Sequence, residues 1–281
     1  MKAFLILEDG TVFTGTSIGS AREAVSEIVF NTSMTGYLEV LTDPSYAGQA
    51  VVMTYPLIGN YGICYDDMES ARPWPDGFIV RELSRLPSNF RCEDTIQNFL
   101  EKNDIPGISG IDTRALTKIL REKGTMNGMI TTREYEDLEE PISRIKAYSV
   151  KGVVKATSCK EKYVLEPEDS KLQEPVHRVA LLDLGAKKNI ARSLVERGCE
   201  VTVYPCDTPA EEILASCPDG IMLSNGPGDP KENTEIIREI RKLYVRYTDF
   251  CDLSWSSADG AGNRSRHLQT EIWTQGRKSS G

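Results

Sequence analysis

The chain has 281 residues, which favours two domains, and its apolar fraction of 40% is enough for buried cores. Its formal net charge of −9 argues against a nucleic-acid partner and against an anionic membrane surface, and no run of 18 apolar residues predicts a membrane span. The seven cysteines are odd in number and form no Cys-x-x-Cys pair, so we expect free thiols in a reducing cytoplasm, with neither disulfides nor a metal site.

The first part of the chain alternates short apolar runs with turn residues, which is typical of a strand-rich domain. We predict strands at 3–7, 11–15, 25–31, 50–55, 78–83 and 128–131, the first two forming a hairpin. Residues 39–42 fit a short strand or a turn of helix, and 43–49 and 56–62 read as loops. Helices are expected at 95–103 and 113–123, the second capped by Asp112 and ended by Gly124. The prediction is a mixed domain spanning residues 1–150.

The chain changes character between residues 134 and 175, where acids and lysines dominate. A helix is expected near 136–147. The charged residues that follow are typical of a solvated surface, and we predict a linker at 151–175.

Regular alternation of strands and helices begins at residue 176. Strands are expected at 178–182, 200–204 and 219–223, with helices at 187–197 and 209–215 and another from about residue 232. Continuous apolar strands alternating with helices predict a doubly wound, flavodoxin-like parallel sheet, which binds its ligand at the carboxyl ends of the strands.

A glycine-rich turn, Leu-Ser-Asn-Gly-Pro-Gly-Asp-Pro at 223–230, lies at such an end. Without a Cβ atom, Gly226 and Gly228 allow positive φ and a close approach of backbone N–H groups to a ligand. The turn therefore fits an oxyanion site or an ordinary strand-to-helix connector. A nucleotide-binding flavodoxin-like domain is the less favoured interpretation, since the chain has no Gly-x-Gly-x-x-Gly or Walker A turn.

Five motifs in this order resemble blocks of the small, glutamine-hydrolysing subunit of carbamoyl-phosphate synthetase. They are Asn-Thr-Ser-Met-Thr-Gly-Tyr (31–37), Asp-Pro-Ser-Tyr (43–46), Tyr-Pro-Leu-Ile-Gly-Asn-Tyr-Gly (55–62), Gly-Ile-Asp-Thr-Arg (110–114) and the glycine-rich turn. The resemblance covers about residues 1–244. Other class I amidotransferases share the turn but lack the first 150 residues.

The resemblance implies an N-terminal domain that docks on a large subunit and a class I glutamine amidotransferase domain that carries a Cys–His–Glu triad. Ser45, Gly226 and Gly228 are expected to bind L-glutamine, although Ser45 taken alone is only a turn serine. Released ammonia would pass to the large subunit, which makes carbamoyl phosphate from bicarbonate and ATP for arginine and pyrimidine biosynthesis. No cofactor is expected in the small subunit. ATP and a divalent metal would belong to the large one.

The resemblance ends near residue 245, and the segment 246–281 has the composition of a disordered tail. Cys251 lacks the glycine and glutamine of the family's Gly-x-Cys-x-Gly-x-Gln nucleophile elbow, so we do not assign it as the nucleophile. The catalytic cysteine, histidine and glutamate are thus expected to be absent from this chain, making it inactive.

A shift of the reading frame accounts for the lost motif. Codons that the genetic code permits for residues 252–277 can be chosen so that, read one base later, they spell Ile-Cys-Leu-Gly-His-Gln and continue as the family's next helix, strand and loop. The single codon of Trp255 and of Trp273 forces a glycine in the shifted frame, where the family has one. We interpret this as a frameshift near residue 245, with the nucleophile's codon straddling Leu253 and Ser254, and with the chain truncated before the family's histidine and glutamate.

Two functions remain open: the glutaminase subunit of the synthetase, or a catalytically dead copy that acts as a docking module. Loss of the nucleophile strand would leave at most three parallel strands with uncovered apolar faces. We therefore expect the second domain to be marginally stable alone, while residues 1–150 fold.

Overall fold

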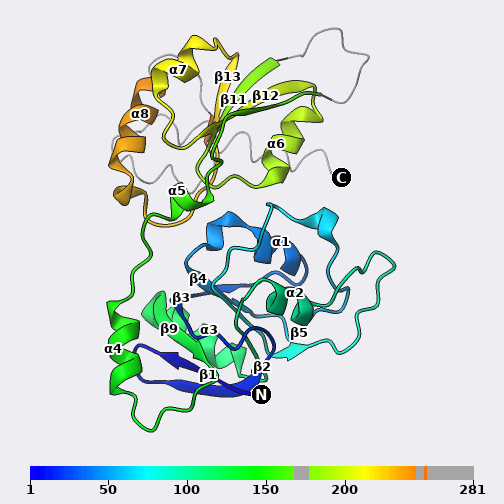
Figure 1. The fold of residues 1–281 in the computed structure, drawn as a ribbon, viewed down its shortest axis with the longest axis vertical. Helices are drawn as coiled ribbons and strands as arrows, with labels where there is room; N and C mark the ends of the chain where they lie inside the picture. Colours follow the sequence, from blue (N-terminus) through cyan, green and yellow to red (C-terminus); the bar gives the residue numbers. More distant parts are fainter. Residues whose placement is uncertain (168–176, 245–249, 252–281) are drawn as a thin grey trace.

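The computed structural model describes residues 1–167, 177–244 and 250–251, and these form two lobes joined by the segment that follows α4 (Figure 1). Seven strands of the first lobe close into a barrel in the order β1-β2-β8-β6-β4-β3-β9. These strands are β1 (Lys2–Leu7), β2 (Val12–Ser17), β3 (Ala24–Asn31), β4 (Gln49–Met53), β6 (Gly77–Ile79), β8 (Gly107–Ser109) and β9 (Met126–Thr131). The predicted β1–β2 hairpin is confirmed by an antiparallel register that pairs Leu5 with Phe13.

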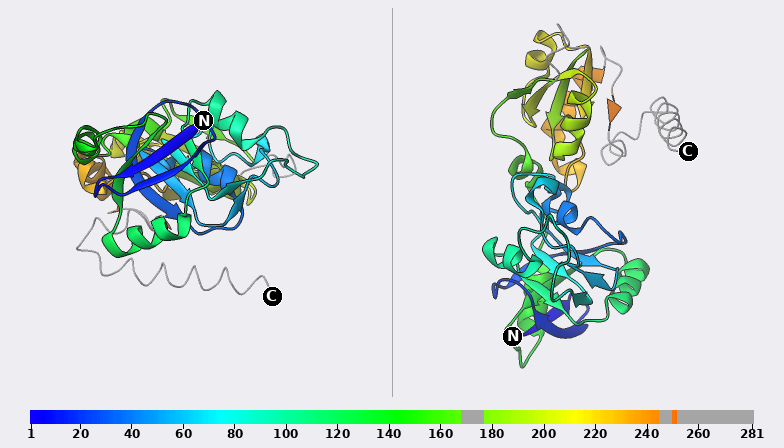
Figure 2. Two further views of the ribbon diagram at one scale, coloured as in Figure 1. Left: turned by 90° about the horizontal axis from the view of Figure 1, so that it is seen from below. Right: turned by 90° about the vertical axis from the view of Figure 1, so that its right-hand side faces the viewer.

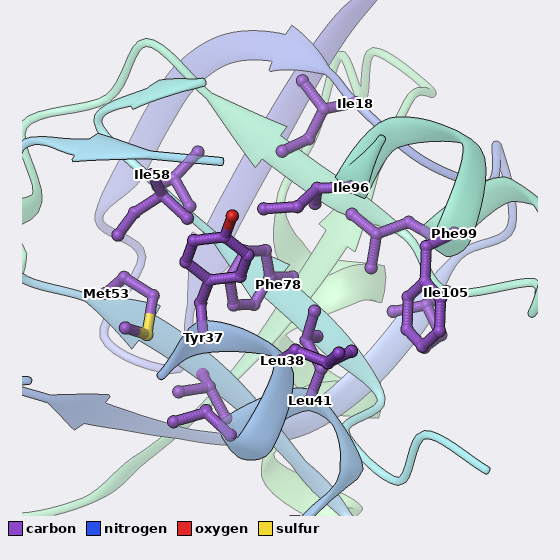
Figure 3. Packing of buried hydrophobic residues seen from close by; sticks show 14 of the residues in the cluster. Ile18, Tyr37, Leu38, Leu41, Met53, Ile58, Phe78, Ile96, Phe99 and Ile105 are labelled. Carbon is purple, nitrogen blue, oxygen red and sulfur yellow. The ribbon is translucent and has the colours of Figure 1, made fainter. Parts of the chain in front are cut away.

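Both faces of β4 are buried, since its consecutive side chains point to opposite sides and each side packs on helices. On β4, Val51 and Met53 belong to a buried cluster with residues of helices α1 (Tyr37–Thr42) and α2 (Ile96–Lys102), and Figure 3 shows Met53 beside Tyr37. The alternate residues of β4 pack with helix α3 (Thr113–Lys123). Helix α4 (Glu139–Ala147) covers β1 and β9 through the buried Ile145.

Local sequence signals explain why α3 begins and ends where it does. The Asp112 carboxylate accepts hydrogen bonds from the backbone N–H groups of Arg114 and Ala115, at 3.1 and 3.0 Å. This satisfies donors that have no partner inside the helix. Gly124 follows the last turn with φ 88, a conformation that favours glycine. Both predicted ends of α3 are confirmed.

The second lobe contains a five-stranded sheet with the order β10-β12-β11-β13-β14. These strands are β10 (Tyr163–Leu165), β11 (His177–Asp183), β12 (Cys199–Pro205), β13 (Gly220–Leu223) and β14 (Phe250–Cys251). β11 is central and runs parallel to β12 and β13. The doubly wound parallel sheet predicted here, preceded by a strand-rich domain, is confirmed as the fold class.

Helices cover both faces of this sheet. Helices α7 (Ala210–Ala215) and α8 (Thr234–Tyr244) pack on the face that carries Leu182, and α6 (Lys188–Val195) packs on the face that carries Leu181. The prediction that the apolar faces of β11 and β13 are uncovered is therefore wrong.

The prediction of at most three strands is also wrong. β14 pairs in parallel with β13, Leu223 opposite Cys251, and β10 adds an antiparallel edge beside β12. The rest of the 246–281 tail, predicted to be disordered, lies outside the described residues.

The predicted linker at 151–175 belongs in large part to the second lobe. Helix α5 (Val153–Thr157) places Val154 in the core under α7 and α8, and β10 follows it. The many charged residues of this segment indicated a solvated linker. A short helix with one buried valine and a three-residue edge strand need few apolar residues, so the composition of the segment does not reveal them. The remainder of this stretch, 168–176, lies outside the described residues.

The predicted strand at 78–83 is split. β6 ends at Ile79, and β7 (Glu82–Leu83) leaves the barrel to pair with β5 (Leu57–Ile58), which lies inside the predicted loop 56–62. The segment 43–49 contains a short 3-10 turn at Pro44–Tyr46, and the described residues form further such turns at Tyr65–Asp67 and Pro230–Glu232. The views in Figure 2 show the second lobe stacked on one end of the barrel lobe.

Candidate functional site

The glycine-rich turn begins where β13 ends, at the carboxyl edge of the parallel sheet. Ser224 is fully buried, and its hydroxyl oxygen accepts a hydrogen bond from the Leu184 backbone N–H at 2.9 Å. The same hydroxyl donates to the Asn225 carbonyl oxygen at 2.7 Å. Ser224 therefore ties the turn after β13 to the turn after β11.

Glycine is required where the turn meets its neighbours. Gly228 has φ 76, and a Cβ atom there would lie 2.8 Å from Val153 Cγ2 of α5. Gly185, with φ 121, packs against the other side of the turn, and its Cβ would lie 2.8 Å from Pro227 Cδ. A methyl group at either position would force a neighbouring side chain to shift, so the turn is packed closely between α5 and the loop after β11.

Asp183 organises the loop after β11. Its Oδ1 accepts the backbone N–H groups of Gly185 and Ala186, at 2.9 and 2.7 Å, and its Oδ2 accepts the Cys159 N–H at 2.7 Å. The carboxylate thus connects the sheet edge to the segment that follows α5.

Two thiols lie near this edge. Burial, reinforced by the Asp183 carboxylate, raises the pKa of the Cys159 thiol to about 12. Burial also raises the pKa of the Cys206 thiol. Nucleophilic attack needs the thiolate, so neither cysteine is poised to act as a nucleophile near neutral pH. Neither lies in a motif that the sequence analysis singled out.

Ser45 reaches the glycine-rich turn from the barrel lobe. Asp43 caps the Pro44–Tyr46 turn by accepting the Ser45 backbone N–H at 2.9 Å. The Ser45 hydroxyl then accepts a hydrogen bond from Asn225 Nδ2 at 2.7 Å, across 180 residues of sequence. The structure therefore brings together Ser45 and the turn that contains Gly226 and Gly228.

Further polar contacts fix the two lobes around this point. Lys187 Nζ lies 3.0 Å from Asp43 Oδ2, which is largely buried. Asn189 Nδ2 donates to Glu69 Oε1 at 2.6 Å, and the Lys188 backbone N–H donates to the Glu69 carbonyl oxygen at 2.7 Å. Both contacts come from the start of α6, so the turn after β11 is joined to the barrel lobe.

Sequence reasoning missed Asn225, Asp43 and Lys187. The first two lie inside motifs quoted above, beside the residues that were selected, but nothing local indicates that 43–45 and 225 meet.

The histidines offer no catalytic partner at this edge within the described residues. His177 begins β11, at the opposite end of the strand, where it is exposed and its Nδ1 lies 3.9 Å from Asp219. His267 lies outside the described residues, as does the segment expected to carry the shifted nucleophile codon.

In the part of the chain that the structure describes, no group of three or more histidine, cysteine, aspartate or glutamate residues could hold a metal ion. None of the described helices has the length and apolar character needed to cross a membrane.

Comparison with known proteins gives a match for each lobe. Residues 5–130 match the family model of the carbamoyl-phosphate synthase small chain, CPSase domain. Residues 180–247 match the model of class I glutamine amidotransferases. The second match ends at residue 247, close to residue 245, where the resemblance described in the sequence analysis ends.

Curated relatives match across both lobes. The carbamoyl phosphate synthase small chain of Clostridium perfringens is 52% identical over 243 residues, covering 86% of this chain and 67% of the relative. Those of Syntrophotalea carbinolica and Oceanobacillus iheyensis are 47% and 50% identical, with 67% and 64% of the relative covered. The chain spans about two thirds of the length of the curated relatives it matches.

Proposed function

The chain belongs to the family of carbamoyl phosphate synthase small chains, and from this we propose that its described residues form the glutamine-binding part of a glutaminase. The reaction hydrolyses the carboxamide of L-glutamine to glutamate and ammonia. Ammonia would pass to a large subunit that makes carbamoyl phosphate from bicarbonate and ATP, for arginine and pyrimidine biosynthesis. ATP and a divalent metal would be bound by that partner, in the cytoplasm.

The observation that carries this proposal is the hydrogen bond between Ser45 and Asn225. It joins a loop of the barrel lobe, which matches the synthase family, to the turn of the lobe that matches the amidotransferases. A site that needs both lobes fits a synthase small chain better than an amidotransferase without the barrel. Gly226 and Gly228 are proposed to turn backbone N–H groups toward the ligand and its oxyanion.

The chemistry requires a thiolate that attacks the carboxamide carbon, a histidine that protonates the departing ammonia, and a water that releases glutamate from the thioester. Cys159 and Cys206 do not meet this need, because burial raises the pKa of each thiol. The nucleophile is proposed to lie in the shifted reading frame, after β14.

A second candidate function is a docking module without hydrolysis. It is favoured by the printed sequence after Tyr244, which contains no nucleophile elbow. The barrel lobe would then bind the large subunit, while the second lobe performs no chemistry.

Two measurements on the 281-residue chain separate these functions. Glutamate release, with and without a large subunit from a relative, is expected to stay at background, whereas calorimetry is expected to detect L-glutamine binding that Ser45→Ala weakens. Measurable glutamate release would refute the loss of the nucleophile. Absence of glutamine binding, together with retained binding to the large subunit, would leave only the docking function.

A further inference from the structure

Residues 148–153, the connector, join α4 of the barrel lobe to α5 of the second lobe (Figure 1). At the start of the connector, the Tyr148 hydroxyl donates a hydrogen bond to the Gly48 carbonyl oxygen at 3.0 Å. At its end, Val153 Cγ2 lies 2.8 Å from the position that a Cβ atom would take at Gly228. Both glycines belong to loops of the candidate site. The connector therefore touches that site in each lobe.

The start of the connector packs closely on the Ser45 loop, residues 43–48. Gly48, the last residue of this loop, has φ 83, and a Cβ atom there would lie 2.8 Å from Val150 Cγ1. The same atom would lie 3.4 Å from the Tyr148 hydroxyl oxygen. A side chain at this position would force the connector to move, so the glycine permits the close contact.

The Tyr148 hydroxyl is presented to the loop from a fixed position. Asn127 Nδ2 donates to the carbonyl oxygens of Ile145 and Tyr148, at 3.2 and 3.0 Å, and so ties the end of α4 to β9. Burial raises the pKa of Tyr148 to about 12, so the phenol keeps the proton that it donates near neutral pH. Asp76 Oδ2 lies 3.4 Å from the same hydroxyl, which makes the bond to Gly48 the shorter one.

The Ser45 loop is thus fixed at both ends. Its first residue, Asp43, lies 3.0 Å from Lys187 of the second lobe, and its last residue is held by the connector. Ser45, between these ends, accepts the hydrogen bond from Asn225 of the glycine-rich turn. The spacing of the two loops therefore depends on both anchors.

We propose that the connector sets the distance between the Ser45 loop and the glycine-rich turn, and that Tyr148 is a positioning residue for the ligand. This rests on the proposed function, which places L-glutamine at these two loops. When the Tyr148 hydrogen bond is lost, a smaller fraction of the molecules holds both loops in register, and the apparent affinity falls by that fraction. A linker without this role would leave the affinity unchanged.

Calorimetry of L-glutamine binding to the full chain tests the role of Tyr148. Tyr148→Phe removes only the hydroxyl and is expected to weaken binding about twofold to tenfold, the equivalent of one net hydrogen bond. Ser45→Ala should then weaken binding by a smaller factor in the Tyr148→Phe background than in the unaltered chain, because both changes act on one loop. Independent factors, or an unchanged affinity in Tyr148→Phe, would overturn the inference.

Tyr135→Phe is the matched control. Tyr135 is a half-buried tyrosine of the same lobe, and its hydroxyl donates to Glu23 Oε1 at 2.9 Å instead of to the Ser45 loop. This variant is expected to leave the affinity for L-glutamine unchanged. A loss equal to that of Tyr148→Phe would mean a general effect on the barrel lobe and would contradict a positioning role.

A longer connector tests the distance itself. One glycine inserted between the exposed residues Lys151 and Gly152 adds up to about 3.5 Å and removes no side chain. This variant is expected to weaken L-glutamine binding by about twofold or more, because fewer molecules hold the two loops in register. An unchanged affinity would show that the connector does not set the distance.

Hydrogen exchange gives a readout that needs no ligand. The Glu27 backbone N–H donates to the Gly48 carbonyl oxygen at 3.3 Å. Its exchange is expected to be about twofold to tenfold faster in Tyr148→Phe and unchanged in Tyr135→Phe. Equal exchange in the two variants would overturn the inference, whereas absence of L-glutamine binding by the unaltered chain would overturn the proposed function.

Discussion

Replacing Gly228 by alanine should destabilise the second lobe through a specific contact with α5. A non-glycine residue with left-handed backbone angles costs about 1–2 kcal/mol. Gly228 has φ 76, and the added Cβ would lie 2.8 Å from Val153 Cγ2, an overpacked contact that costs about 1–3 kcal/mol. Alanine also makes the unfolded chain stiffer than glycine does, and this offsets about 0.4–1 kcal/mol of these costs. The expected loss in free energy of unfolding is therefore about 1–4.6 kcal/mol, centred near 3 kcal/mol.

Gly152→Ala is the control for backbone conformation alone. Gly152 has φ 66 and precedes Val153, but nothing lies within 4 Å of its would-be Cβ atom. Gly152→Ala should therefore lower the free energy of unfolding by about 1 kcal/mol. This is the cost of the left-handed backbone angles minus the gain from a stiffer unfolded chain. The difference between the two variants isolates the contact with Val153.

Native-state hydrogen exchange of the β11, β12 and β13 amides measures these losses in the second lobe separately from the barrel. Adding Val153→Ala to Gly228→Ala removes the opposing methyl groups and should recover part of the loss, giving a favourable coupling between the two changes. Equal losses in Gly228→Ala and Gly152→Ala, without coupling to Val153, would refute the packing of the turn against α5.

Other consequences can be tested independently. Burial alone would raise the pKa of Asp9, but hydrogen bonds from Lys123 and the backbone lower it to about 2; Asp9→Asn should therefore lower the free energy of unfolding at pH 7, and urea titrations should show that cost disappearing as the pH falls from about 4 toward 2. Cys159 should be alkylated far more slowly than the exposed Cys217 at pH 8, as peptide mass spectrometry would show, because its raised pKa keeps it protonated. Phe90 is 98% exposed, so Phe90→Ser should change the free energy of unfolding by less than about 0.5 kcal/mol in urea titrations.

Sequence reasoning predicted best where the signal is local. The cap at Asp112 and the end at Gly124 define α3 from adjacent residues, and alternation with turn residues defines the β1–β2 hairpin. Closure of the barrel was not predictable in this way. It depends on pairings such as β1 with β9, which lie more than a hundred residues apart.

The second lobe shows the same limit. Tyr163–Leu165 is too short and too surrounded by charge to indicate a strand, yet the open edge of β12 pairs with it. In the candidate site, the motifs gave Ser45 and the glycine-rich turn, whereas the role of Asn225 follows only from a contact across 180 residues. Short-range pattern cannot contain that information.

The most direct test of the central claim is the sequence of the coding DNA from codon 235 onward past codon 281. The account predicts an insertion or deletion near codon 245, after which the frame reads Ile-Cys-Leu-Gly-His-Gln and continues to a catalytic histidine and glutamate. Confirmation of the printed frame would contradict the claim, because the chain would then hold a glutamine site without a nucleophile and would be at most a docking module.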